Sequence, residues 1–140
     1  MSLEFKDNSN AVKKMLERLC IAAVTEAGIE LLEQVQKNTK VVTGRTKESW
    51  QMDTKENSQG VAVCVGSNYE NAIWEEFGTG EYALHGDGRK GGWVYQAPKG
   101  EFYFTKGKTP NRPMYNAFTA LKNKLIKRYA DILRSKIGGR

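Results

Sequence analysis

The sequence has little of what catalysis and metal binding usually require. Its 140 residues include one histidine and two cysteines. The histidine, His85, lies in a glycine-rich stretch that would not hold an imidazole in place as a general base. There is no Cys/His cluster and no calcium-type spacing of acidic residues. We therefore expect no catalytic residue, no metal site and no cofactor, and hence no enzyme.

Long apolar runs are also missing. No stretch approaches the roughly 18 apolar residues that cross a membrane, and the first ten residues are polar, unlike a secretory signal. The sequence therefore predicts no membrane contact and a cytoplasmic protein, unless a larger assembly carries it elsewhere. Cys20 and Cys64 lie in apolar patterns without partner spacing, so we expect both to be reduced and buried in the core.

Negative charge is almost absent from the C-terminal quarter. Residues 106–140 contain ten Lys and Arg and a single acidic residue, Asp131, which gives a net charge of +9. Residues 1–105 contain 12 Lys and Arg and 15 Asp and Glu, which gives a net charge of −3. On a helix, Lys124, Lys127 and Arg134 fall opposite Leu125 and would form a basic face. Such a face attracts either an acidic protein partner or nucleic acid.

Periodicity predicts a long helix at each end of the chain. The first is expected from about residue 9 to 37, and after Gly28 its apolar positions point to another side. Either the helix bends there, or its two halves have different surroundings. The second is expected from about residue 111 to 137. Its apolar face would contain Met114, Phe118, Leu121, Leu125, Tyr129 and Ile132.

Between the helices, strand-like segments separated by turn residues predict two hairpins. The first spans residues 50–65, and its second strand, 61–65, has the apolar character of a strand buried on both faces. The second spans residues 93–104. We therefore expect a single α+β domain over residues 1–140, in which a small antiparallel sheet of two hairpins packs against the long N-terminal and C-terminal helices.

A short helix, expected over residues 69–77, leads into residues 78–92, where six of fifteen residues are glycine. This composition predicts a flexible loop. Glu75 and Glu76 are neighbours on the short helix, diverge by about 100° and cannot flank one substrate atom. We expect Glu75 to face solvent, and Glu76 to accept hydrogen bonds from the N–H groups of Thr79 and Gly80.

Three segments, at residues 42–49, 72–80 and 105–117, resemble motifs of the HK97 gp10 type of phage protein. They are similar to "TGxLxxS", "YAxxvEfGTG" and "TkGkxP…PFlxxA". The matching residues are Thr43, Gly44, Ser49, Ala72, Glu76, Phe77, Gly78, Thr79, Gly80, Thr105, Gly107 and Pro113. These motifs also suit structural roles: Thr43 as a helix cap, Gly44 at a close approach, and Gly78 as a left-handed helix end.

The resemblance implies a structural phage or prophage protein of the neck or tail. Such a subunit joins head to tail, or completes the tail, by docking onto other neck and tail proteins. It implies a ring-forming homo-oligomer, made in the cytoplasm of the bacterial host and then carried in the virion, with at most weak, non-specific DNA contact. The alternative, from the residues alone, is a nucleic-acid-binding module that uses the basic C-terminal helix.

Overall fold

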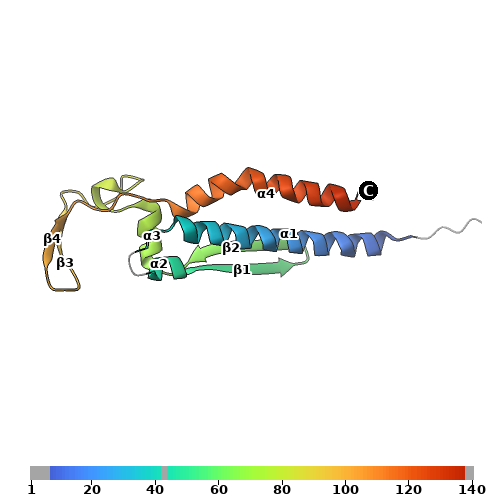
Figure 1. Cartoon of the computed structure of the whole chain (residues 1–140), viewed down its shortest axis with the longest axis horizontal. Coiled ribbons are helices and arrows are strands. Elements are labelled where there is room, and N and C mark those ends of the chain that lie inside the picture. Colours follow the sequence, from blue (N-terminus) through green and yellow to red (C-terminus); the bar gives the residue numbers. More distant parts are fainter. Residues whose placement is uncertain (1–6, 42–43, 138–140) are drawn as a thin grey trace, which may run out of the picture.

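Two long antiparallel helices, α1 (Ser9–Asn38) and α4 (Pro113–Ile137), run side by side in the computed structural model, which describes residues 7–41 and 44–137 (Figure 1). Along the pair, the Cys20 Sγ lies 2.9 Å from the Tyr129 hydroxyl oxygen. At one end of the pair, the Asn38 side-chain amide donates to the Pro113 carbonyl at 3.2 Å. The two helices expected from periodicity are therefore confirmed.

The first hairpin, β1 (Trp50–Asn57) and β2 (Gly60–Ser67), packs on α1. Its strands pair antiparallel from Trp50 opposite Ser67 to Asn57 opposite Gly60. The contact centres on Gly28 of α1, where an added Cβ would lie 2.2 Å from a methyl carbon of Val63. Gly28 therefore lets the sheet approach the helix closely.

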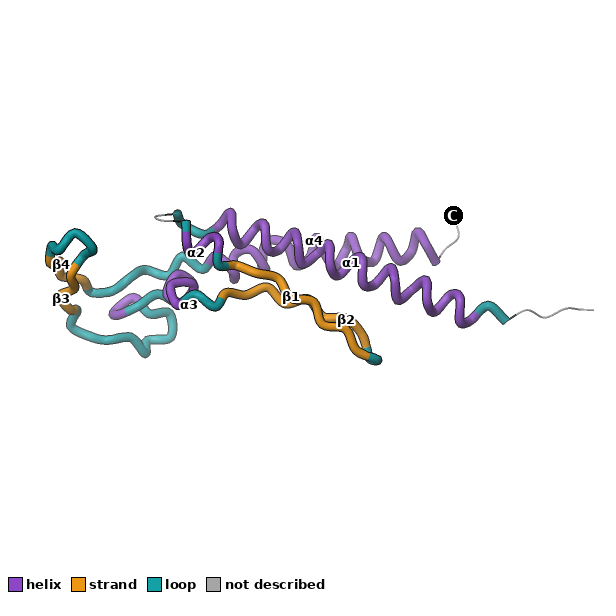
Figure 2. The backbone as a smooth tube through the Cα atoms, turned by 90° about the horizontal axis from the view of Figure 1, so that it is seen from below, coloured by secondary structure: helices purple, strands orange, loops and turns teal. Residues whose placement is uncertain are grey.

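The two halves of α1 have different surroundings, which is one of the two explanations that the sequence left open. Val35, beyond Gly28, is fully buried, whereas Val12 and Met15 in the first half are 48% and 40% exposed. The helix forms the middle layer, with the β1–β2 hairpin on one side and α4 on another (Figures 1 and 2).

The second hairpin stands apart at the far end of the molecule (Figure 1). It comprises β3 (Trp93–Gln96) and β4 (Phe102–Thr105), which form their own two-stranded sheet. The α+β class with long terminal helices is confirmed. The arrangement differs from expectation in that the two hairpins do not share a sheet, and α4 packs mainly on α1 instead of on strands.

The buried core lies where four elements meet. Val35 of α1, Trp50 of β1, Ala72 of α3 (Glu70–Phe77) and Ala117 of α4 form one cluster. The indole N–H of Trp50 donates to the Thr39 hydroxyl at 2.9 Å, so the buried polar atom of this large side chain is satisfied. This core fixes the position of α3 relative to both long helices.

Three expectations about the core are wrong. In β2, half-buried and exposed residues alternate, because α1 covers only one face of the hairpin. Cys64 is consequently exposed, while Cys20 is partly buried. Phe118 is 52% exposed, because α4 contacts the core through Ala117 and Leu121. No helix in the described part of the chain is long and apolar enough to cross a membrane.

Candidate functional site

The segments that carry the second and third motifs pair with each other. The Thr79 N–H donates to the Lys108 carbonyl at 2.9 Å, and the Lys108 N–H donates to the Thr79 hydroxyl at 2.8 Å. The Glu81 N–H donates to the Lys106 carbonyl at 2.8 Å. Two motifs that are separate in the sequence therefore form one structural unit. We call this unit, residues 75–81 and 105–115, the junction.

The glycines of the junction allow its two segments to approach closely. A Cβ at Gly80 would lie 2.2 Å from the Lys106 carbonyl oxygen, and one at Gly107 would lie 2.1 Å from the Thr79 carbonyl oxygen. Gly80 also has a φ of 62°, which favours glycine. These motif residues are thus explained by backbone packing.

Glu76 caps α4. Its carboxylate accepts hydrogen bonds from the N–H of Met114 at 2.8 Å and from the N–H of Tyr115 at 2.9 Å. The prediction that Glu76 accepts hydrogen bonds from the amides of Thr79 and Gly80 is wrong, because α3 directs the Glu76 side chain towards the start of α4. A carboxylate at a helix N-terminus satisfies free N–H groups and interacts favourably with the helix dipole.

Glu75 is buried, so the expectation that it faces solvent is also wrong. Its side chain is ion-paired with Lys108, and its carbonyl accepts hydrogen bonds from the N–H groups of Asn111 at 2.8 Å and Arg112 at 3.1 Å. The second turn of α3 therefore lies beneath the segment that leads into α4. Both adjacent glutamates hold α4 in place, Glu75 through this segment and Glu76 through the helix cap.

The first motif lies at α2 (Arg45–Glu48). Thr43 lies outside the described residues. Gly44 has a φ of 85°, a backbone conformation that favours glycine. A Cβ there would lie 3.6 Å from the nearest atom, so the prediction of a close approach at Gly44 is wrong. The Ser49 hydroxyl lies 2.6 Å from both the Thr46 carbonyl oxygen and the Ser67 hydroxyl oxygen. It thereby connects α2 to the end of β2.

The remaining motif residues also have structural positions. Ala72 belongs to the core, and Pro113 is fully buried at the first position of α4, where its missing N–H costs no helical hydrogen bond. The Thr105 hydroxyl accepts a hydrogen bond from the Gly107 N–H at 3.1 Å. Gly78 ends α3 with a φ of 71°, and Phe77 lies near His85, with ring centroids 5.5 Å apart.

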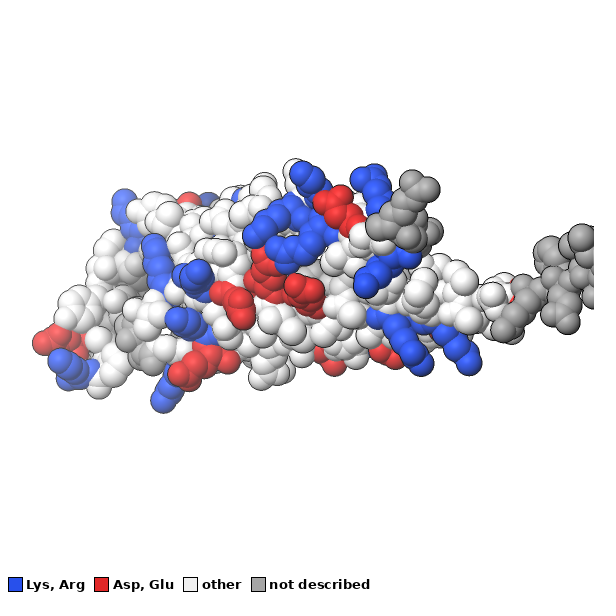
Figure 3. All heavy atoms as spheres, turned by 45° about the vertical axis from the view of Figure 1, so that its right-hand side comes forward, with Lys and Arg blue, Asp and Glu red and all other residues white. Residues whose placement is uncertain are grey.

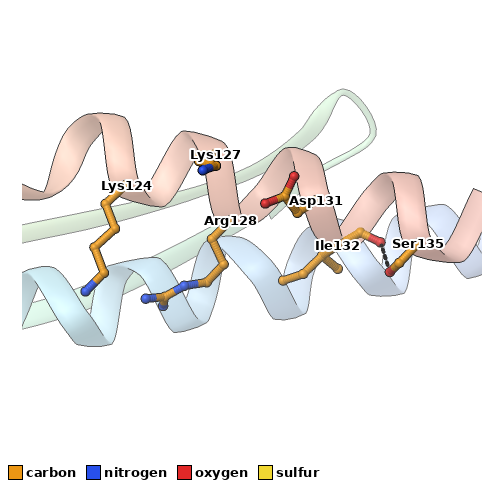
Figure 4. A pocket seen from close by; sticks show the side chains of 6 residues that line it. All are labelled: Lys124, Lys127, Arg128, Asp131, Ile132 and Ser135. Atoms are coloured by element: carbon orange, nitrogen blue, oxygen red, sulfur yellow. Dashed lines mark hydrogen bonds between the residues drawn. The ribbon is translucent and has the colours of Figure 1, made fainter.

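The basic face is only partly free. Lys124 and Arg128 donate to the Glu30 carboxylate at 3.1 and 2.5 Å, and both side chains point towards α1 (Figure 4). These bonds, chiefly the one from Arg128, lower the pKa of Glu30. Arg134 lies 3.8 Å from Asp131, and Lys127 is exposed and forms no ion pair within the described residues. Lysines, arginines and acidic residues lie side by side on this surface (Figure 3).

Two further links between α1 and the C-terminal part of the chain were missed in the sequence. Glu26 and Glu30 lie four residues apart on α1, as do Lys124 and Arg128 on α4, and Arg128 reaches both glutamates. This matched spacing could have indicated the ion pairs. The second link, from the Asn111 side-chain amide to the Asn38 carbonyl at 2.9 Å, leaves no comparable pattern.

The second hairpin exposes most of its large side chains. We call residues 93–105 the arm. On one of its faces, Val94, Phe102 and Phe104 are 63%, 70% and 62% exposed. The other face is better filled, since Arg89 lies 5.7 Å from the Trp93 ring, and the rings of Tyr95 and Tyr103 are 6.0 Å apart. The arm therefore presents one bare apolar face.

Within the described residues, no group of three or more His, Cys, Asp or Glu side chains could hold a metal ion. The uncovered apolar face of the arm is typical of a surface that contacts another molecule. Residues 4–78, more than half of the chain, match the family described as "Bacteriophage HK97-gp10, putative tail-component". The chain belongs to this family of phage tail components. No curated protein and no solved structure matches it.

Proposed function

We propose that this tail component is a neck or tail-completion subunit, which joins head to tail or completes the tail by docking onto other subunits. In the assembled particle it acts as a ring-forming homo-oligomer among other neck and tail proteins, by shape and contact and without catalysis. It is made in the cytoplasm of the host and carried in the virion.

The observation that carries this proposal is the amount of uncovered surface. The described residues include seventeen exposed large apolar side chains and five buried apolar ones. Such a surface favours burial against partner subunits.

The alternative, a nucleic-acid-binding module that uses α4, has less support. Lys124 and Arg128 are engaged with Glu30, and Arg134 lies next to Asp131. This pairing reduces the positive charge available to phosphates. A weak, sequence-independent contact with passing DNA remains compatible with the neck proposal.

Deletion of the gene from the phage or prophage tests the proposal. Electron microscopy of the lysate should show DNA-filled heads and separate tails, or tails of abnormal length, and complementation by the wild-type gene should restore complete particles. Complete, infectious particles from the deletion strain would refute the proposal.

A further inference from the structure

The bare face of the arm has a counterpart elsewhere in the same chain. A pocket of about 590 Å³ lies between the first half of α1 and the turn that joins β1 to β2. We call it the α1 pocket. Its apolar lining consists of Leu16, Cys20, Ile21 and Val61. A cavity of about 150 Å³ holds one benzene ring, so this pocket is large enough for the rings of Phe102 and Phe104.

The two surfaces are also complementary in charge. Glu17 and Glu56 lie at the α1 pocket together with Lys13, and neither glutamate has an ion pair within the described residues. Lys99, in the turn of the arm, is equally unpaired there, whereas the carboxylate of the nearby Glu101 accepts the Tyr103 hydroxyl. An arm seated in the pocket would bring the Lys99 ammonium towards two free carboxylates.

Within one chain these surfaces cannot meet. The arm stands at one end of the elongated molecule, and the turn between β1 and β2 points towards the other end (Figures 1 and 2). A two-stranded hairpin is only marginally stable alone, so the arm is expected to be covered by something else.

We propose that the arm of one copy docks into the α1 pocket of a second copy, with Val94, Phe102 and Phe104 against Leu16, Ile21 and Val61. This contact joins two different surfaces, so it repeats head to tail and closes into a ring when the rotation between copies allows it. The inference rests on the proposed ring-forming function and identifies the surfaces that make the ring.

Sedimentation velocity on three purified variants tests the contact. The arm variant carries Val94→Ser and Phe102→Ser, the pocket variant carries Leu16→Arg, and Ile126→Ser is the control, since Ile126 is 62% exposed on α4, outside both surfaces. Wild type and control should associate as their concentration rises. Self-association of the arm and pocket variants should weaken roughly 30-fold or more, as expected when apolar anchors are lost. Circular dichroism checks that each variant is folded.

Mixing the two defective variants gives the decisive result. The pocket variant keeps an intact arm and the arm variant keeps an intact pocket, so a mixture should form a heterodimer and stop there. An arm-to-arm contact predicts instead that the pocket variant still associates by itself. That result, a monomeric wild type, or a mixture without heterodimer would overturn the inference.

Charge exchange provides a second test that leaves the apolar residues unchanged. Lys99→Glu should weaken association, and combination with Glu17→Lys and Glu56→Lys should restore it. Unchanged association of the Lys99→Glu variant would count against the proposed orientation. All these measurements use isolated protein, so their failure would leave the gene-deletion phenotype, and with it the proposed function, standing.

Discussion

The carboxylate of Glu76, in the last turns of α3, accepts the backbone N–H of Tyr115, in the first turn of α4, at 2.9 Å. It also accepts the N–H of Met114 at 2.8 Å. A side chain 38 residues earlier in the sequence thus supplies the N-terminal cap of α4. The glutamate of the "EfGTG" motif consequently determines where the last helix begins and how it meets the core.

Replacing Glu76 should therefore destabilise the whole domain. Glu76→Ala removes both hydrogen bonds and the favourable charge at the helix dipole, at a cost of about 2 kcal/mol in the free energy of unfolding. Glu76→Gln keeps one acceptor and should cost about half as much. Urea denaturation followed by tryptophan fluorescence measures both. Glu33→Ala is the control, since Glu33 is exposed and has no partner in the described residues, and it should change little.

Two glycines with similar backbone conformations should differ sharply in their tolerance of alanine. Gly80 and Gly86 have φ values of 62° and 71°, but a Cβ at Gly80 would meet the Lys106 carbonyl oxygen, whereas one at Gly86 would meet nothing within 4 Å. Gly86→Ala should cost about 1 kcal/mol, from its positive φ alone. Gly80→Ala should cost about 3 kcal/mol or more, since the clash adds to the φ strain. Equal losses would show that the junction is not closely packed in solution.

The ion pairs of Glu30 should make stability depend on acidity. The folded pKa of Glu30 lies below its ordinary value of about 4.3, so its contribution is complete above about pH 5 and is lost as pH falls through the lowered folded pKa. Glu30→Gln should therefore cost about 1 kcal/mol in the free energy of unfolding near pH 7 and less near pH 3. Unfolding curves at the two pH values measure this difference. Glu33→Gln is the control, since Glu33 is exposed and forms no ion pair in the described residues.

The elements could be predicted from the sequence, because they depend on local patterns. Apolar periodicity gives α1 and α4, and strand-like segments separated by turn residues give both hairpins. The layer order could not be predicted, since it depends on which side of α1 each partner covers. Gly28, for example, faces β2, and its missing side chain lets Val63 pack directly against the helix. For the same reason periodicity placed Phe118 in the core, although α4 is rotated so that Ala117 faces inwards.

The motif residues could be identified from the sequence, but their partners could not. Glu75 was assigned to solvent because a carboxylate without a catalytic role usually lies on a solvated face, and its burial depends on the segment that carries Lys108. That segment is more than 30 residues away in the sequence. Similarly, the charge of α4 was evident, but its neutralisation by Glu30 requires knowing that the two helices pack antiparallel.

The two parts of the glycine-rich stretch 78–92 should differ in the rate at which their backbone amides exchange with solvent. The N–H groups of Thr79, Glu81 and Leu84 donate to backbone carbonyls of the junction and of Phe77, so their exchange with solvent should be slow. Residues 87–90 lack comparable bonds among the described residues and should exchange rapidly in the isolated subunit. Hydrogen exchange followed by NMR gives the rates, with the core amides as a protected reference. Strong protection across residues 87–90 in the free monomer would contradict this prediction.

The basic face distinguishes the neck protein from a nucleic-acid-binding module. Lys127 and Arg134 are the members of this face that do not hold α1, so reversing them with Lys127→Glu and Arg134→Glu should leave the domain folded. If DNA only passes this surface, wild-type protein should bind unrelated duplexes weakly and equally, with an affinity that falls steeply as salt rises. The double variant should reduce the slope of log affinity against log salt concentration by about 0.9 for each lost phosphate contact.

Lys47→Glu with Lys55→Glu is the control, an equal charge change on exposed residues remote from α4, and it should keep the wild-type slope. Fluorescence anisotropy with two unrelated duplexes at two salt concentrations supplies these values. Sub-micromolar, sequence-selective binding near physiological salt would instead favour the nucleic-acid-binding module. A subunit along a DNA passage should not bind one sequence tightly, because tight binding would slow the passage of the DNA.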